Sequence, residues 1–212
     1  MEIKRFEVNL FGENTYVIWD STTREAAVVD PGMSDQTEID EVESFVSANS
    51  LTVKYLLLTH IHIDHTFGIE ALKSAYNAAL LAHKGDVPLG QTRQQQAQMF
   101  RLPVRLGPVE PDRFISDGDT LRLGTEEIKV IHTPGHSQGG VCYYVPESGF
   151  VLTGDTLFRG SVGRTDLPGG NQRQLIISIK SQLLGLPPST VVYPGHGPAT
   201  TIGEEARSNP FL

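Results

Sequence analysis

The run THIHIDH at residues 59–65 places four metal-competent side chains, His60, His62, Asp64 and His65, in one short stretch of chain. The run 53–58, apolar apart from Lys54, comes just before it and is typical of a strand buried on both faces. Open sheets usually bind ligands at the carboxyl ends of such strands. Alternate residues of an extended chain project to the same side, so His60 and His62 can converge on one ion while Asp64 and His65 reach a second.

Three later segments repeat this arrangement of an apolar run, a turn and one polar side chain. TPGH ends at His136, YPGH ends at His196, and FVLTGD ends at Asp155, whose two carboxylate oxygens can bridge two ions. Neutral imidazole and carboxylate are the ligands of zinc, iron and manganese. The sequence therefore predicts a centre for two divalent ions, zinc first and iron or manganese as alternatives, with these ligands: His60, His62, Asp64, His65, His136, Asp155 and His196.

Two other histidines are predicted to lie outside this set. His83 is expected to cap the end of a strand, and His132 is expected to be structural, with a secondary role beside a ligand as the alternative. The single cysteine, Cys142, lies in the apolar run 141–145, which indicates a small core residue rather than a nucleophile.

Composition and charge restrict the class of partner. The chain has 212 residues, 39% of them hydrophobic, with a net charge of -8, as expected of one globular domain spanning 1–212. The negative charge argues against a nucleic-acid partner. A single cysteine, no apolar segment after Met1 and no run of about 20 apolar residues favour a cytoplasmic protein without a membrane partner. We expect a small-molecule substrate, and the sequence predicts no oligomeric state.

Periodicity predicts a mixed α/β fold. Strands are expected at residues 3–10, 15–19, 26–29, 53–58 and 78–82, and again at 120–123, 128–131, 140–145, 150–153 and 191–193. Helices are expected after the capping pair Asp35 and Glu38, at 68–77, and around Leu175 to Leu183. Strands come early and a helix late in each half, which predicts two mixed sheets packed face to face with helices outside. A short tail is expected after residue 193, and the polar, proline-broken segment 90–111 is interpreted as a surface excursion, either a lid or a solvated helix and linker.

These motifs together resemble the metallo-β-lactamase-fold superfamily. The match runs from Asp30-Pro-Gly32 to the chain's end and rests on THIHIDH, the two Pro-Gly-His turns and Thr-Gly-Asp155. The resemblance implies a four-layer αββα sandwich, with His60, His62 and His136 on one metal, Asp64, His65 and His196 on the other, and Asp155 between them. It also implies that Asp30 orients a metal-binding histidine.

Within the superfamily, the segment GDTLFRGSVGRTD at residues 154–166 is similar to the glyoxalase II branch, in its short bacterial form. The best-known zinc β-lactamases carry cysteine at the position of Asp155, and oxygen-reducing diiron members carry glutamate at the position of His62. Both differences argue against those activities. The sequence also departs from the larger glyoxalase II enzymes, because only 16 residues follow His196 where those enzymes have a C-terminal helical domain, and because Pro198 and Asp166 stand where they have tyrosines. Arg164 is then either an anchor for a substrate carboxylate or the partner of Asp166 in a structural ion pair.

The resemblance and the ligand chemistry together predict a metal-dependent hydrolase. Hydroxide shared by two ions would attack a carbonyl carbon, with Asp64 as a candidate proton shuttle. A thioester such as S-lactoylglutathione is favoured because its thiolate leaves without needing a proton, and lactones and phosphoesters are alternatives. The competing hypothesis is a mononuclear iron persulfide dioxygenase, which resembles this chain in Gly-Arg-Thr-Asp166 and would use His60, His136 and Asp155.

Overall fold

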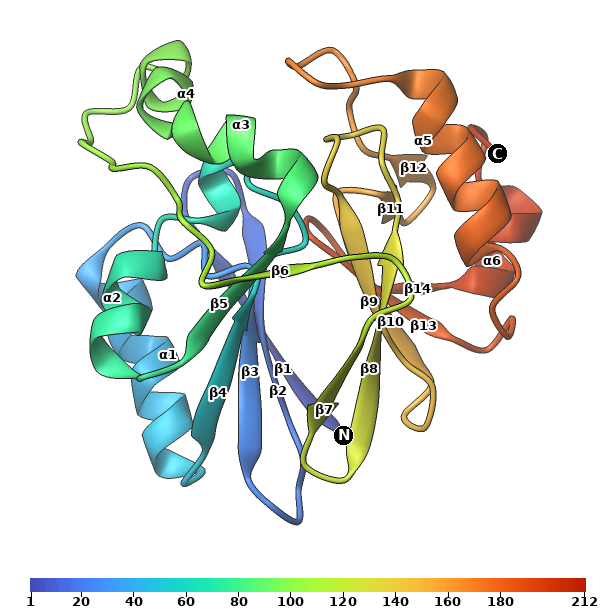
Figure 1. Cartoon of the computed structure of the whole chain (residues 1–212). Helices are drawn as coiled ribbons and strands as arrows, with labels where there is room; N and C mark the ends of the chain where they lie inside the picture. The colour runs from blue at the N-terminus through green and yellow to red at the C-terminus, as the bar shows by residue number, and fades with distance from the viewer.

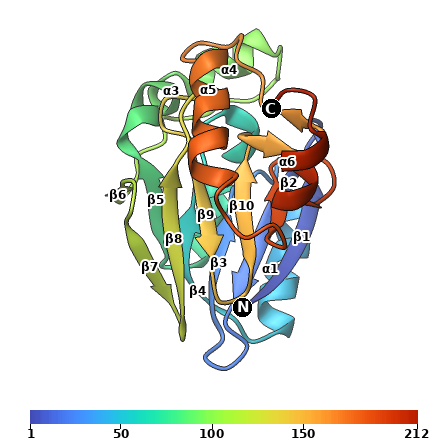
Figure 2. The same ribbon diagram turned by 90° about the vertical axis from the view of Figure 1, so that its right-hand side faces the viewer.

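Two six-stranded sheets pack face to face, and helices cover their outer surfaces (Figure 1). The structure is a computed structural model that describes all 212 residues. It is the four-layer αββα arrangement expected from the alternation of strands and helices. In Figure 2, α5 and α6 lie in front of one sheet, and Figure 1 shows α1 on the outer face of the other.

The first sheet is formed by the N-terminal half, in the order β1-β2-β3-β4-β5-β6. The first three strands are antiparallel, and β3 to β6 run parallel to one another. Its strands are β1 (Glu2–Val8), β2 (Glu13–Trp19), β3 (Glu25–Val29), β4 (Thr52–Leu57), β5 (Ala79–His83) and β6 (Arg113–Ile115). Of the parallel strands, β3 and β5 are buried on both faces along most of their length, which explains their nearly continuous apolar sequences.

The second sheet has the order β14-β13-β10-β9-β8-β7 and is antiparallel except between β10 and β13. Its strands are β7 (Thr120–Leu123), β8 (Glu126–His132), β9 (Val141–Val145), β10 (Phe150–Gly154), β13 (Val191–Pro194) and β14 (Thr200–Thr201). A small hairpin, β11 (Leu157–Phe158) with β12 (Ser161–Val162), follows β10.

Six α-helices accompany the sheets, and several begin at polar caps that the sequence marks. They are α1 (Gln36–Ala48), α2 (Ile69–Ala75), α3 (Val87–Gln91), α4 (Arg93–Met99), α5 (Gln172–Ser178) and α6 (Ile202–Ser208). Asp35 accepts a hydrogen bond from the Glu38 backbone N–H, as the capping pair predicted. The Glu38 carboxylate, however, accepts from the backbones of Asn9 and Ser34 instead of closing the box on Asp35.

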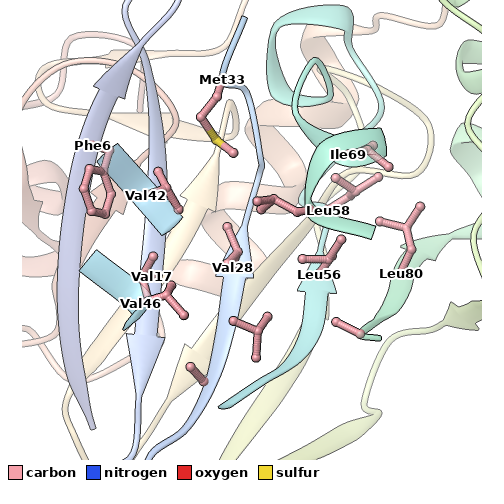
Figure 3. Close-up of a cluster of buried hydrophobic side chains, with 14 of the residues drawn as sticks. Phe6, Val17, Val28, Met33, Val42, Val46, Leu56, Leu58, Ile69 and Leu80 are labelled. Carbon is pink, nitrogen blue, oxygen red and sulfur yellow. The ribbon is translucent and has the colours of Figure 1, made fainter. Parts of the chain in front are cut away.

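Three apolar layers hold the fold together. One lies between the first sheet and α1 and α2, where Val42 and Val46 of α1 meet Val17 and Val28 of the sheet (Figure 3). A second fills the space between the two sheets, and a third packs α5 and α6 against the second sheet, with Cys142 buried in it. The prediction that Cys142 is a core residue is confirmed.

The structure corrects the sequence-based expectation at the C-terminus. The segment after residue 193 is not a simple tail, because β14 completes the second sheet and α6 packs on it. The pairing of β14 with β13 is only two residues long, so the sequence contains no run of β-forming residues that would predict it. The strands β6, β11 and β12 were missed for the same reason. The helix predicted over Leu175 to Leu183 is α5 followed by a π-helical turn at Ile179–Leu183.

The fold brings the polar turns to one end of the molecule. The loops after β4, β8, β10 and β13 all lie toward the upper end in Figure 1. Two hydrogen bonds tie the sheets together there: Tyr143 Oη donates to the Leu58 carbonyl at 2.7 Å, and Val141 N donates to the Thr59 carbonyl at 2.8 Å. No helix is long and apolar enough to cross a membrane.

The Tyr143 hydrogen bond provides a test of this junction. Tyr143 and Leu58 are both fully buried, so Tyr143→Phe leaves the Leu58 carbonyl without its partner. We expect the free energy of unfolding to fall by about 1–3 kcal/mol in urea denaturation. Tyr144→Phe is the matched control, because the Tyr144 hydroxyl has no partner in the protein, and it should change stability far less. Equal effects of the two substitutions would contradict the role assigned to the Tyr143 hydroxyl.

Candidate metal centre

Every side chain predicted to bind metal reaches the same place, although they come from four loops. His60 and His62 follow β4, and Asp64 and His65 lie on the 3₁₀ helix Ile63–His65. The other three follow strands of the second sheet: His136 after β8, Asp155 directly after β10, and His196 after β13. A positive φ at Gly135 and Gly154 sets up two of these turns, and any Cβ at either glycine would clash with neighbouring atoms.

Three histidines form the first group. His62 Nδ1 lies 2.8 Å from His136 Nε2, and that nitrogen lies 3.2 Å from His60 Nε2. All three rings are buried. Two nitrogens bound tetrahedrally to one zinc ion at 2.0–2.1 Å would be about 3.3 Å apart, which is close to the spacing seen here.

The second group combines two histidines with two carboxylates. His196 Nε2 lies 3.3 Å from Asp64 Oδ2, and His65 Nε2 lies 3.8 Å from the same oxygen. Asp155 stands between the groups, with Oδ1 3.5 Å from His65 Nε2 and Oδ2 3.6 Å from His136 Nε2 and from His196 Nε2. Its Oδ1 therefore faces the second group, while its Oδ2 lies between the two groups.

Hydrogen bonds on the outer side of the rings fix which nitrogen carries the proton. His136 Nδ1 lies 2.7 Å from the Arg164 carbonyl, and His196 Nδ1 lies 3.3 Å from the Gly12 carbonyl. A carbonyl oxygen only accepts, so each of these Nδ1 atoms must donate. His65 Nδ1 faces Asp30 Oδ2 at 3.0 Å in the same way. In the neutral rings, each Nε2 therefore points inward with a lone pair.

His60 is oriented by a longer chain of hydrogen bonds. The Thr59 hydroxyl donates to Asp30 Oδ2 at 2.6 Å, so the same hydroxyl accepts from His60 Nδ1 at 3.0 Å. The lone pair of His60 Nε2 then faces that of His136 Nε2 with no proton between them. Burial lowers the pKa of His60 well below its usual value, so protonation does not relieve this contact.

The donor set fits divalent metal ions. Lone pairs that face each other at about hydrogen-bond distance repel unless a cation lies between them. His65 Nε2 and Asp155 Oδ1 are buried atoms without any hydrogen-bond partner in the protein, and both point into the same space. Buried polar atoms are normally paired, so these orphaned atoms indicate coordination positions.

Asp30 supports the site without being free to coordinate. Its carboxylate accepts from the Thr59 backbone N–H at 2.7 Å, from the Thr59 hydroxyl and from His65 Nδ1. Although Asp30, His60 and His65 lie close enough to form a further metal-sized cluster, the oxygens of Asp30 are already occupied by these donors. Its backbone is left-handed, with φ of 49°, a conformation that aspartate tolerates better than most residues.

Two buried carboxyl groups beside the site were not anticipated from the sequence. Asp86 accepts from the Ile61 backbone N–H, the Ser137 hydroxyl and the Gly139 backbone N–H, so it joins the THIHIDH turn to the turn that carries His136. Burial raises its pKa. Glu13 Oε1 lies 3.6 Å from His65 Nδ1, and burial raises its pKa well above the usual value. A lone acid in a strand or loop has no motif that would single it out.

His83 and His132 lie outside the centre, as expected. Their rings stack on each other with centroids 4.2 Å apart. His83 follows β5 and accepts from the Gly85 backbone N–H, so it caps the 3₁₀ turn Lys84–Asp86. His132 Nε2 contacts the Gln138 carbonyl at 3.0 Å, which is a structural contact.

A cavity of about 590 Å³ opens directly above the two groups. His62, Asp64, His136, Asp155 and His196 line its floor. Arg164 lines its wall, and its guanidinium makes two 2.8 Å hydrogen bonds to the Asp166 carboxylate. Of the two roles considered for Arg164, the ion pair with Asp166 is therefore present, while contact with a substrate remains a prediction.

The chain belongs to the metallo-β-lactamase superfamily. The family model described as "Metallo-beta-lactamase superfamily" matches residues 8–196. The chain is 38% identical to "Hydroxyacylglutathione hydrolase GloC" of Haemophilus influenzae, over 100% of this chain and 98% of that protein. Membership of this superfamily supports metal-dependent hydrolase activity, and the clustered histidines and carboxylates described above fit a metal site.

Solved structures agree on the fold. The structure named "BLEG-1 B3 metallo-beta-lactamase" superposes with a TM-score of 0.90 at 33% identity, covering 100% of this chain and 99% of that one. The structure named "TTHA1623 in a di-iron-bound form" has a TM-score of 0.86 at 38% identity, covering 99% and 100%.

The role of Asp30 can be tested by removing its carboxylate. Asp30→Ala frees the Nδ1 proton of His65 and the Thr59 hydroxyl, so the inward lone pairs lose their fixed orientation. We expect metal affinity to fall 10–100-fold, measured by competition with a chromophoric chelator. Asp35→Ala removes only an exposed helix cap and should leave metal affinity unchanged. Unaltered affinity in Asp30→Ala would show that the outer hydrogen bonds do not support the site.

Metal binding should release protons. Burial lowers the pKa of His65 and of His196, but nearby carboxylates outweigh it and raise both, with Asp64 and Asp155 acting on each. In the metal-free protein these groups hold protons until the pH rises through their raised pKa values. Zinc added near pH 7 must displace those protons, so apparent affinity should increase with pH.

Calorimetric titrations in buffers of different ionisation enthalpy measure this release. The binding heat should change between phosphate and Tris near pH 7, and the difference should shrink at higher pH. A heat independent of the buffer at neutral pH would contradict the expected proton release.

Proposed function

We propose that this protein hydrolyses thioesters at a centre of two divalent ions. The observation that carries the proposal is the convergence of inward-facing imidazole lone pairs on the floor of an open cavity. His60, His62 and His136 would hold one ion, and Asp64, His65 and His196 the other, with Asp155 between them. Zinc is the first candidate. Iron is the alternative, because a similar solved structure is named as a di-iron-bound form. When bound, such ions supply an activated water and polarise a carbonyl oxygen.

Asp64 is ionised, so it cannot protonate a leaving group. This favours substrates whose leaving group departs without a proton. Burial raises the pKa of Asp64, but His65 and His196 outweigh burial and lower it, so the group is a carboxylate at neutral pH. It can accept a proton from water but holds none to give to an amine. A thiolate, with a pKa near 8.5, leaves without protonation, whereas an amide nitrogen does not.

The similarity to a hydroxyacylglutathione hydrolase supports the same reaction class. S-Lactoylglutathione is therefore the first small-molecule substrate to test. Lactones and phosphoesters are further candidates, since the site would polarise their carbonyl or phosphoryl oxygens in the same way.

Substitution of the ligands tests the centre. His60→Ala and Asp155→Ala should each lower thioester hydrolysis by more than about a hundredfold, the upper range for residues that only support a ligand, and elemental analysis should show lost metal. His83→Ala is the control, because its ring lies outside the centre. Hydrolysis that persists in metal-free protein would contradict the proposal.

A paired measurement separates hydrolysis from persulfide oxidation. Elemental analysis is combined with two assays: release of free thiol from S-lactoylglutathione, and oxygen consumption with glutathione persulfide. Two metal ions per chain with thiol release support the hydrolase. One iron per chain with oxygen consumption would instead assign the protein to the persulfide dioxygenases.

A further inference from the structure

The cavity above the metal centre has an apolar wall built from separate segments of the chain. Phe11 comes from the turn between β1 and β2, Met99 and Phe100 come from the end of α4, and Phe158 and Leu167 come from the segment after β10. Met99 is 56% exposed, although an apolar side chain is normally covered. Apolar walls with a few polar groups at one end are typical of sites for small organic ligands.

This wall is fixed in place beside the metal-binding turn. Phe11 and Phe100 pack edge to face with centroids 5.3 Å apart. The guanidinium of Arg93 on α4 is fully buried and donates to the Thr66 carbonyl and hydroxyl and to Glu70. Gln96, one turn further, accepts from the Ile63 backbone N–H at 3.0 Å. Helix α4 is thereby tied to the 3₁₀ helix that carries Asp64 and His65.

The same cavity offers little to a charged ligand. Apart from the histidines of the metal centre, Arg164 is the one basic residue that lines it, and its guanidinium is paired with Asp166. The carboxylates on the floor, Asp64 and Asp155, belong to the proposed metal centre and are not substrate contacts in their own right. The amide of Gln96 is engaged by Ile63 and Leu89, so it is not available to a ligand. Glutathione carries two carboxylates, and the cavity wall contains no unpaired cation for either.

We infer that the cavity selects thioesters with an uncharged, apolar chain beside the reacting carbonyl, rather than glutathione conjugates. This inference rests on the proposed thioester hydrolysis and names its substrate class. The chain is an aliphatic or aromatic group that packs against Phe11, Met99 and Phe100. It can belong to the acyl part or to the thiol part of the thioester, and the two sources are distinguished by experiment.

The inference is tested on the metal-loaded protein with matched thioesters. Acetyl and hexanoyl thioesters of N-acetylcysteamine vary the acyl chain, and acetyl thioesters of N-acetylcysteamine and hexanethiol vary the thiol. In whichever series lengthens the part that packs in the cavity, the acyl chain or the thiol, kcat/KM should rise about fourfold for each buried methylene. Hexanoyl-N-acetylcysteamine should also be hydrolysed with a higher kcat/KM than hexanoylglutathione. A preference for the glutathione thioester of the same acyl group would overturn the inference.

Substitutions locate the selectivity. Phe100→Ala should lower kcat/KM for the preferred long-chain thioester by about tenfold and leave the acetyl thioester of N-acetylcysteamine little changed. Phe114→Ala is the matched control, because Phe114 is exposed on the edge strand β6 and does not line the cavity. Arg164→Ala should not alter the preference. A rise in KM for glutathione thioesters alone in Arg164→Ala would show instead that Arg164 binds a carboxylate.

A binding measurement tests the apolar selectivity of the cavity separately from the proposed thioester hydrolysis. S-Hexyl and S-methyl thioethers of N-acetylcysteamine cannot be hydrolysed, and their affinity for the metal-free protein is measured by calorimetry. Tighter binding of the hexyl compound, weakened by Phe100→Ala but not by Phe114→Ala, supports the apolar cavity. If this pattern holds but no thioester is hydrolysed by the metal-loaded protein, the proposed reaction is wrong and the cavity assignment stands. Equal binding of the two thioethers overturns the inference.

Discussion

Two unprotonated imidazole nitrogens that face each other inside this protein repel, and the contacts around the site hold them in place against this repulsion. His60 and His136 face each other through unprotonated nitrogens because carbonyl, hydroxyl and carboxylate acceptors hold the protons on the outer side of each ring. Such an arrangement costs free energy unless a cation lies between the two nitrogens. The packed sheets therefore hold the four loops that carry the histidines and carboxylates, although the facing nitrogens repel.

Buried carboxylates do most of this positioning. Asp30 fixes Thr59 and His65 from the first sheet, and Asp86 joins the THIHIDH turn to the turn of the second sheet that carries His136. Hydrogen bonds from Tyr143 and Val141 to the end of β4 bring the two sheets together at the same level. Metal binding and sheet packing thus depend on the same few contacts, so that changes in one are expected to affect the other.

Polar and apolar side chains line different parts of the cavity. Its floor carries the histidines and carboxylates, and its wall is formed by aromatic and aliphatic side chains held by α4. The segment 90–111, interpreted from its composition as a surface excursion or lid, contributes that wall through α4. The sequence alone did not show whether the polar residues of this segment are exposed or buried. Arg93 and Gln96 are buried because they form hydrogen bonds with the metal-binding turn, and hydropathy does not reveal such contacts.

The sequence by itself determined the layered fold and the set of candidate ligands, because strand periodicity and the spacing of His and Asp after apolar runs are local properties. Longer strands such as β4 and β10 were visible for this reason, whereas the two-residue strands β11, β12 and β14 depend on partners far along the chain. Only the tertiary structure decided which ring nitrogen faces inward, that Asp86 and Glu13 lie beside the site, and that the cavity wall is apolar. Each of these depends on contacts between segments that are distant in sequence, and no local pattern encodes them.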